Sequence, residues 1–270
     1  MIQRFTYDII ATGSTGNAVL ITVHISQSSS YHILIDMGIS YKRLKEAFEK
    51  ASFVFITHEH QDHLNLSAYN KLKEHHPRTT IITNKAVSEK IKVNGYIKPT
   101  VIIEDFQTFY IGDLKITALP NEHNVECQGY IFEYDGQVLL YATDLSTTLH
   151  YKDYLEEKGL LVDILLLEGN YRYDVFRYYV HIKGDSMIDL FNNGSSRHLE
   201  IGEYNEFKDQ FLKPEGQSEM LHQSSTYATP EGLVAKMNSE AKKRNDSNGT
   251  HYKTITIEDF EKWKKNVGKM

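Results

Sequence analysis

Seven residues in the first quarter of the chain, Thr57 to His63, have the side chains and the spacing of a metal site. Their sequence, Thr-His-Glu-His-Gln-Asp-His, directly follows a short apolar run that is typical of a strand. Alternate side chains of an extended segment share a face, so His58 and His60 should point the same way where that strand ends. Imidazoles and carboxylates are the ligands that zinc and similar divalent ions prefer. With Asp62 and His63 on the turn beyond, the segment holds more ligands than one ion needs. We therefore predict two neighbouring ions rather than a solvated polar loop.

Three residues downstream have the same ligand character and stand where expected strands end. His123 follows one strand, Asp144 ends another, and His222 precedes a turn-like serine pair. Taken singly, each has an ordinary structural explanation as a loop residue, a turn or cap residue, or a core histidine. Together with residues 57–63 they predict a common edge of the fold to which rigid strands deliver the ligands.

The surrounding elements alternate between strands and helices in two rough halves. Asp135-Gly136, between two apolar runs, predicts a two-residue hairpin turn. Two sheets packed face to face with helices outside would bury such apolar strands, which predicts an α/β fold of the αββα sandwich type. The strands are expected at 2–10, 18–25, 31–37, 53–56, 80–83, within 100–120, and at 130–134, 138–141 and 162–167. The helices are expected at 41–50, 67–74, 85–93, 149–158, 229–244 and after Thr256.

The length of 270 residues suits one sizeable domain, or one domain with a small appendage. We expect a catalytic domain over residues 1–244, followed by a linker and a C-terminal helix over residues 245–270. Phe260 and Trp263 share one face of that helix and should dock on the domain or on a partner subunit. The lone Cys127 excludes an internal disulfide and fits a reducing compartment. With no signal-peptide core and no membrane-length apolar run, we expect a cytoplasmic protein with no membrane partner.

The net charge of the chain indicates which size of substrate it can bind. The formal net charge is −6, and the clearest basic cluster, residues 242–244, is better explained as a solvated helix end. Proteins that bind long nucleic acids usually carry a basic stripe, because phosphate neutralisation supplies most of the affinity. The balance therefore favours a small substrate, without excluding nucleic acid.

The pattern HxHxDH, with a later lone histidine, a lone aspartate and a late histidine, resembles the metallo-β-lactamase-fold hydrolases. The resemblance extends from residues 13–17 through Asp36-Met37-Gly38 to the helix after Ser225, and is closest to the YycJ-like and tRNase Z-like phosphodiesterase branch. It implies two mixed β-sheets face to face, flanked by helices, and two divalent metal ions. Zinc suits the nitrogen-rich ligand set, and manganese is the other candidate. The implied ligands are His58, His60 and His123 for one ion, Asp62, His63 and His222 for the other, and Asp144 as the bridge.

Two further segments sharpen the resemblance. Glu168 resembles a glutamate of the phosphodiesterase branch, and His198 resembles its short histidine motif. The resemblance implies that Glu168 orients His198 and that His198 protonates the leaving oxygen, as an alkoxide leaving from phosphorus requires. An ordinary surface ion pair is the structural alternative. Arg197 stands where the family commonly has glycine, so the loop before His198 departs from the family pattern.

These features predict a metal-dependent hydrolase of phosphodiester bonds, with Asp62, Asp144, Glu168 and His198 as catalytic residues. No large insertion separates Asp144 from His222, which favours small cyclic nucleotides as substrates. The resembling branch includes phage anti-Pycsar enzymes, which hydrolyse cyclic nucleoside monophosphates. For a phage protein, this activity would counter a defence signal in the host cytoplasm.

Two other functions stay open: a YycJ-like DNA exonuclease, and a non-catalytic metal-binding regulatory protein. The resemblance also implies a homodimer. An aromatic-rich segment after Glu168 could stack a base or pack a dimer contact or lid. Its members are Tyr171, Tyr173, Phe176, Tyr178 and Tyr179.

Overall fold

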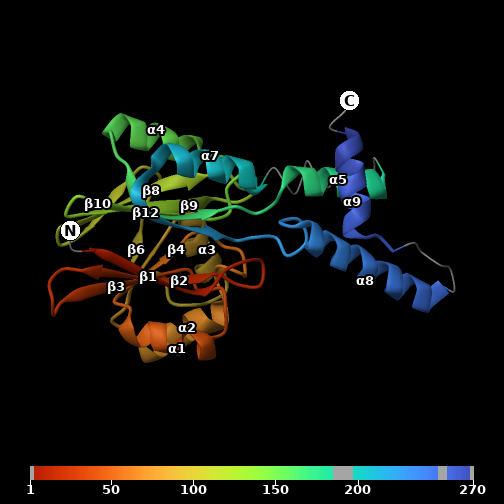
Figure 1. The fold of residues 1–270 in the computed structure, drawn as a ribbon. Helices are drawn as coiled ribbons and strands as arrows, with labels where there is room; N and C mark the ends of the chain where they lie inside the picture. Colours follow the sequence, from red (N-terminus) through yellow and green to blue (C-terminus); the bar gives the residue numbers. More distant parts are fainter. Residues whose placement is uncertain (1–2, 185–196, 249–253, 268–270) are drawn as a thin grey trace.

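The computed structural model describes residues 3–184, 197–248 and 254–267. They form two six-stranded mixed β-sheets that lie face to face, with helices against the outer faces (Figure 1). Apolar side chains from both sheets form one continuous core between them. The αββα sandwich predicted from the alternation of strands and helices is confirmed.

Residues 5–102 build the first sheet and the helices that cover it. In chain order its elements are β1 (Phe5–Ala11), β2 (Ala18–His24), β3 (Ser30–Ile35), α1 (Tyr41–Lys50), β4 (Phe53–Ile56), α2 (Leu66–His75), β5 (Thr80–Thr83), α3 (Lys85–Val93) and β6 (Val101–Ile102). The strands lie in sequence order; β1 to β3 pair antiparallel, and β3 to β6 pair in parallel. The apolar stripe of α1, with Leu44, Ala47 and Phe48, packs on the outer face of this sheet as its periodicity predicts.

The second sheet has the mirrored order β12-β11-β10-β9-β8-β7. Its elements are β7 (Thr108–Ile111), β8 (Leu114–Asn121), β9 (Cys127–Tyr134), β10 (Gln137–Ala142), α4 (Leu149–Lys158), β11 (Val162–Glu168), α7 (Ile201–Phe211) and β12 (Leu212–Leu221). The continuous apolar run of β11 fits its position, because it pairs in parallel with β10 and β12 and is covered by α4 and α7. The predicted hairpin turn joins β9 to β10, and both Asp135 (φ 48°) and Gly136 (φ 75°) adopt the left-handed conformation that such a turn needs.

Three helices pack together beside the sandwich, where Figure 1 shows α5, α8 and α9 projecting to one side. They are α5 (Tyr173–Lys183), α8 (Pro230–Asn248) and α9 (Ile257–Val267), and they share their own apolar cluster. Phe260 of α9 is 1% exposed, and its ring lies 5.3 Å from that of Tyr178 on α5. The expected C-terminal helix therefore docks on helices of its own chain.

Several predicted boundaries are wrong: β1 begins at Phe5 instead of residue 2, and β9 begins at Cys127 instead of residue 130. The helix that begins after Thr229 continues to Asn248 instead of ending near Arg244, so the first part of the expected linker is helical. Among the described residues, no helix is long and apolar enough to cross a membrane.

Candidate metal centre

Three imidazoles meet where β4 ends and the loop after β8 passes it. His58 Nε2 lies 3.0 Å from His60 Nδ1, which lies 3.4 Å from His123 Nε2. In a tetrahedral site with zinc–nitrogen distances of about 2.0–2.1 Å, neighbouring ligand atoms are about 3.4 Å apart. His58, His60 and His123 are therefore spaced as three ligands of one ion.

A second group of possible ligands combines two residues of the loop after β4 with His222. Oδ2 of Asp62 is 3.7 Å from Nε2 of His63 and 3.5 Å from Nε2 of His222. His222 follows β12 directly, and its left-handed backbone (φ 51°) turns the chain away from the sheet. Asp62, His63 and His222 form a group that could hold a metal ion.

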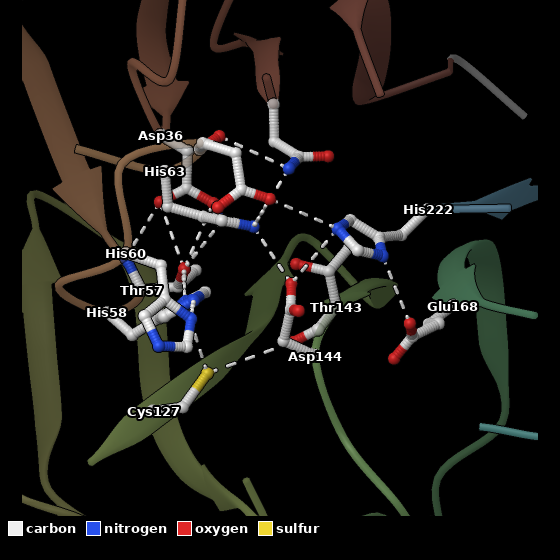
Figure 2. Close-up of polar contacts among 12 residues, drawn as sticks. Asp36, Thr57, His58, His60, His63, Cys127, Thr143, Asp144, Glu168 and His222 are labelled. Carbon is white, nitrogen blue, oxygen red and sulfur yellow. Dashed lines mark hydrogen bonds and ion pairs between the residues drawn. The ribbon is translucent and has the colours of Figure 1, made fainter. Parts of the chain in front are cut away.

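Asp144, which follows β10, lies between the two groups (Figure 2). Its Oδ1 is 3.8 Å from Nε2 of His123, a member of the first group. Its Oδ2 is 2.8 Å from Nε2 of His63 and 3.6 Å from Nε2 of His222, both in the second group. One carboxylate thus presents an oxygen to each group, which is the arrangement a bridging ligand needs.

The centre has the polar atoms and the chemistry to hold divalent cations. Two of its buried atoms, Asp144 Oδ2 and His222 Nε2, make no hydrogen bond of normal geometry with the described residues. Buried polar atoms are rarely left unsatisfied, and a cation beside both would satisfy them. Five imidazoles and two carboxylates also match the ligand preference of zinc-like ions.

Opposite charges hold the side chains of the centre together. Burial alone would lower the pKa of His63, but Asp36 and Asp144 outweigh it and raise that pKa to about 10. Burial likewise opposes protonation of His222, but the neighbouring carboxylates of Asp62 and Glu168 outweigh it and raise its pKa to about 11. A metal ion would displace such imidazole protons when it binds, so loading should release protons.

Asp36 belongs to the centre although its role was not predicted. This fully buried residue follows β3, and its Oδ2 lies 2.7 Å from Nδ1 of His63. Its Oδ1 accepts hydrogen bonds from the backbone N–H of Thr57 (2.8 Å) and the Thr57 hydroxyl (3.0 Å). The contact fixes the proton of His63 on Nδ1 and turns Nε2 toward the ligand group. An acid at the end of an apolar strand that neighbours β4 is the signal that could have revealed it.

Glu168 and His198 form a pair at the edge of the centre. Nδ1 of His198 lies 2.7 Å from Oε1 of Glu168 and 3.7 Å from Oδ1 of Asp144. Glu168 is fully buried, whereas 24% of the His198 side chain is exposed. The alternative of an ordinary surface ion pair is therefore wrong. Burial lowers the pKa of His198, but the bond to Glu168 outweighs it and leaves that pKa raised.

The loop around His198 is anchored through the backbone of Arg197. Nδ1 of His123 lies 3.0 Å from the backbone carbonyl oxygen of Arg197, to which it can donate. This contact ties the loop to the first ligand group through a main-chain atom. The lone Cys127 is buried beside the same group, with Sγ 3.5 Å from Nδ1 of His58 (Figure 2).

The structure brings all nine predicted site residues into one centre. Their individual roles as ligand or proton donor stay predictions. The nine are His58, His60, Asp62, His63, His123, Asp144, Glu168, His198 and His222.

A two-sheet sandwich with a histidine–aspartate centre at one edge defines a class of protein, the hydrolases of metallo-β-lactamase fold. The family follows from the sequence match. Residues 31–199 match the model described as the Beta-lactamase superfamily domain, so the chain belongs to this superfamily. The predicted fold family and the predicted hydrolase class are confirmed at this level.

Two curated proteins show similarity along the chain. This chain is 28% identical over 139 residues to a UPF0173 metal-dependent hydrolase of Alkaliphilus metalliredigens, and the match covers 48% of this chain and 60% of that protein. The chain thus spans less than two thirds of that relative. It is 26% identical over 201 residues to exodeoxyribonuclease WalJ of Streptococcus pneumoniae, covering 69% of this chain and 71% of the relative.

Solved structures share the fold at low identity. The metallo-β-lactamase-fold protein YhfI of Bacillus subtilis matches with a TM-score of 0.61 and 20% identity, covering 86% of this chain and 90% of its own. A diphosphatase of the PhnP family matches with a TM-score of 0.58 and 16% identity, covering 88% and 91%. The short form of human tRNase Z matches with a TM-score of 0.55 and 12% identity, covering 83% and 95%. These likenesses establish the fold alone.

Proposed function

We propose that this chain is a two-metal phosphodiesterase whose substrates are small cyclic nucleotides. The observation that supports the proposal is the buried Glu168–His198 pair, 3.7 Å from the carboxylate of Asp144. Hydrolysis of a phosphodiester joins a water oxygen to phosphorus and breaks the bond to the leaving oxygen. That oxygen needs a proton, and His198 is positioned to supply it.

The chain's residues divide the chemistry between them. Divalent ions, when bound, lower the pKa of water toward about 7 and neutralise charge on the phosphoryl oxygens. Asp144 faces both ligand groups and would hold them at a fixed separation. Because Nδ1 of His198 faces Glu168, its Nε2 remains to deliver the proton. Glu168 favours the protonated imidazole and keeps it in this orientation.

The size and charge of the molecule favour a small substrate. A net charge of −6 opposes association with a long polyanion. The relatives named as a metal-dependent hydrolase and an exodeoxyribonuclease support hydrolysis, in the second case of phosphodiester bonds. If the chain is encoded by a phage, removal of a cyclic-nucleotide signal would serve against a host defence.

An exodeoxyribonuclease is the second candidate, and the similarity to WalJ favours it. Such an enzyme would shorten DNA ends, and its rate would fall steeply with salt. A non-catalytic regulatory protein is the third candidate. The Glu168–His198 pair argues against it, since a binding scaffold has no use for a proton donor beside its metal centre.

One panel of assays separates the three candidates. The purified chain is loaded with zinc or manganese and incubated with cyclic nucleoside monophosphates and with end-labelled DNA, with and without chelator. We expect ring opening to a nucleoside monophosphate, and its loss with chelator or in Asp144→Asn. Asp113→Asn, at an exposed turn, is the matched control. Hydrolysis of DNA alone would overturn the cyclic-nucleotide substrate, and hydrolysis of neither would support the regulatory candidate.

A further inference from the structure

A cavity of about 310 Å³ adjoins the metal centre on the side of its proton donor. It lies between the start of α5 and residues 223–227, which join β12 to α8. His198 and His222 line it, so the cavity and the centre share one wall. Its volume is at the small end of the roughly 300–1,000 Å³ found for small-molecule sites.

Three aromatic side chains form the wall of the cavity away from the metal centre. The Phe176 ring lies 6.3 Å from the Tyr171 ring and 5.2 Å from the Tyr227 ring, each in an edge-on arrangement. Tyr178 and Tyr179, which belong to the aromatic-rich segment expected to stack a base or pack, are buried in the helical cluster instead. Tyr179 packs behind the wall, with its ring 6.1 Å from that of Phe176 and 5.3 Å from that of Tyr227.

Backbone hydrogen bonds fix this aromatic wall in place. The N–H of Arg172 donates to the carbonyl of Tyr227 (3.0 Å), and the N–H of Ser224 donates to the carbonyl of Asn170 (2.8 Å). The N–H of Tyr227 donates to the hydroxyl of Ser224 (3.1 Å). The segment after Glu168 and the segment after His222 are thus tied together across the cavity. A rigid aromatic wall needs little reorganisation when a flat ligand binds.

The lining of the cavity fits an uncharged, flat group. Among the described residues that line it, none is a lysine or an arginine, and none is acidic. Phosphate groups would find no cation there apart from the two histidines of the shared wall. Aromatic faces stack nucleobases without regard to sequence, while hydroxyl and amide groups at the rim can reach the polar edges of a base.

We infer that this cavity is the nucleoside subsite of the centre, and that it takes the base of a single nucleotide against Phe176 and Tyr227. The inference rests on the proposed function for the identity of the ligand. His198 lies in the shared wall, so the leaving oxygen and the bound nucleoside are on the same side of the phosphorus. In a 3′,5′-cyclic nucleotide both ester oxygens belong to one nucleoside, which satisfies this arrangement. A cavity of this size holds one nucleoside.

Binding tests the subsite without requiring turnover. The metal-loaded full chain is titrated with adenosine and, separately, with base-free ribose 5-phosphate, by calorimetry. Tyr227→Ala should raise the Kd of adenosine about 5- to 100-fold, and Tyr227→Phe should restore it, because stacking needs only the ring. Tyr110→Ala removes a tyrosine that is 62% exposed and is the matched control. Equal adenosine binding in wild type and Tyr227→Ala, or no adenosine binding at all, would overturn the inference.

A second variant separates loss of binding from loss of packing. Ser225→Trp, at an exposed turn residue on the cavity rim, fills the entrance without removing a ring from the aromatic wall. We expect it to abolish adenosine binding while its melting curve stays close to wild type. Retained adenosine affinity in a folded Ser225→Trp chain would contradict the subsite.

Kinetics distinguish failure of the subsite from failure of the proposed function. The ratio of kcat/KM for cyclic AMP to that for methyl 4-nitrophenyl phosphate, which has no base, should fall in Tyr227→Ala by the factor seen in Kd. An unchanged ratio in an active enzyme would remove the subsite and leave the phosphodiesterase. Specific adenosine binding without hydrolysis of any phosphodiester would remove the phosphodiesterase and leave the subsite.

Discussion

Nδ1 of His198 lies 2.7 Å from Oε1 of Glu168, whose side chain is completely buried. The same oxygen lies 3.2 Å from Nδ1 of His222, and Oε2 accepts a hydrogen bond from the backbone N–H of Leu145 (3.0 Å). One carboxylate therefore holds the proposed proton donor, a proposed metal ligand and the residue next to Asp144. The geometry links proton delivery to the metal centre through a single side chain.

The pH dependence of turnover should report this link. Glu168 raises the pKa of His198 against the effect of burial, and an acid catalyst works only while it is protonated. Activity should therefore be present below the folded pKa of His198 and be lost as the pH rises through it. Glu168→Gln removes the negative charge, so the alkaline limb of the kcat profile should move to lower pH. Profiles measured at saturating metal, with Glu215→Gln as an exposed control, check this. An alkaline limb at the same pH in both enzymes would contradict it.

Removal of single ligands should abolish turnover and leave a folded chain. His60→Ala, Asp62→Ala and Asp144→Ala each take a ligand from the centre without opening the core between the sheets. Wild type should bind two metal equivalents by elemental analysis, and His60→Ala should bind fewer. Chelation should also lower Tm, since metal at 1,000 times its Kd stabilises by about 4 kcal/mol. Full activity in any of these variants would end the two-metal account.

Asp36 should control metal affinity without touching the ion. Loss of a residue that orients a metal-binding histidine typically weakens affinity about 10- to 100-fold. Asp36→Asn removes the charge beside His63 and keeps a residue that tolerates the left-handed backbone there (φ 61°). Competition with a chelator measures the affinity, and Asp8→Asn on the exposed side of β1 is the control. Wild-type affinity in a folded Asp36→Asn chain would show that the contact does not position His63.

The helical cluster should open independently of the sandwich. Phe260→Ala removes a fully packed ring between α9 and α5, at a cost of about 3–5 kcal/mol to their docking. Hydrogen exchange should accelerate in residues 257–267 and 173–183, with little change in the strands. Tyr110→Ala, at an exposed site, should change neither region. Uniform acceleration through both sheets would show that the cluster and the sandwich unfold as one unit.

Local sequence patterns were enough to find most of the sandwich and its ligands. The apolar run before His58 and the ligand spacing after it lie within eleven residues, 53–63. The Asp135-Gly136 turn is likewise determined by a short local pattern. The helices at 41–50, 85–93 and 149–158 follow from apolar periodicity and have the expected bounds. Where a short stretch determines its own structure, the prediction held.

Elements that depend on distant partners were not predictable in this way. The strand β12 contains Pro214, Gly216 and several charged residues, and it is a strand because β11 pairs with it at the sheet edge. The contact of Asp36 with His63 connects the segments that follow β3 and β4. The backbone hydrogen bond from Ser224 to Asn170 connects two segments on either side of the cavity. Such contacts require the tertiary fold. The homodimer and the cytoplasmic location stay predictions.

The most direct test of the central claim compares two leaving groups in His198→Ala. Hydrolysis of 3′,5′-cyclic AMP expels an alkoxide that needs a proton, whereas thymidine 5′-(4-nitrophenyl phosphate) releases a stable phenolate. A positioned general acid contributes about 10²- to 10⁴-fold, so kcat for cyclic AMP should fall by that factor and kcat for the nitrophenyl ester by less than about tenfold. An equal loss for both substrates, or full activity with cyclic AMP, would contradict the assignment of His198 as the proton donor of a phosphodiesterase.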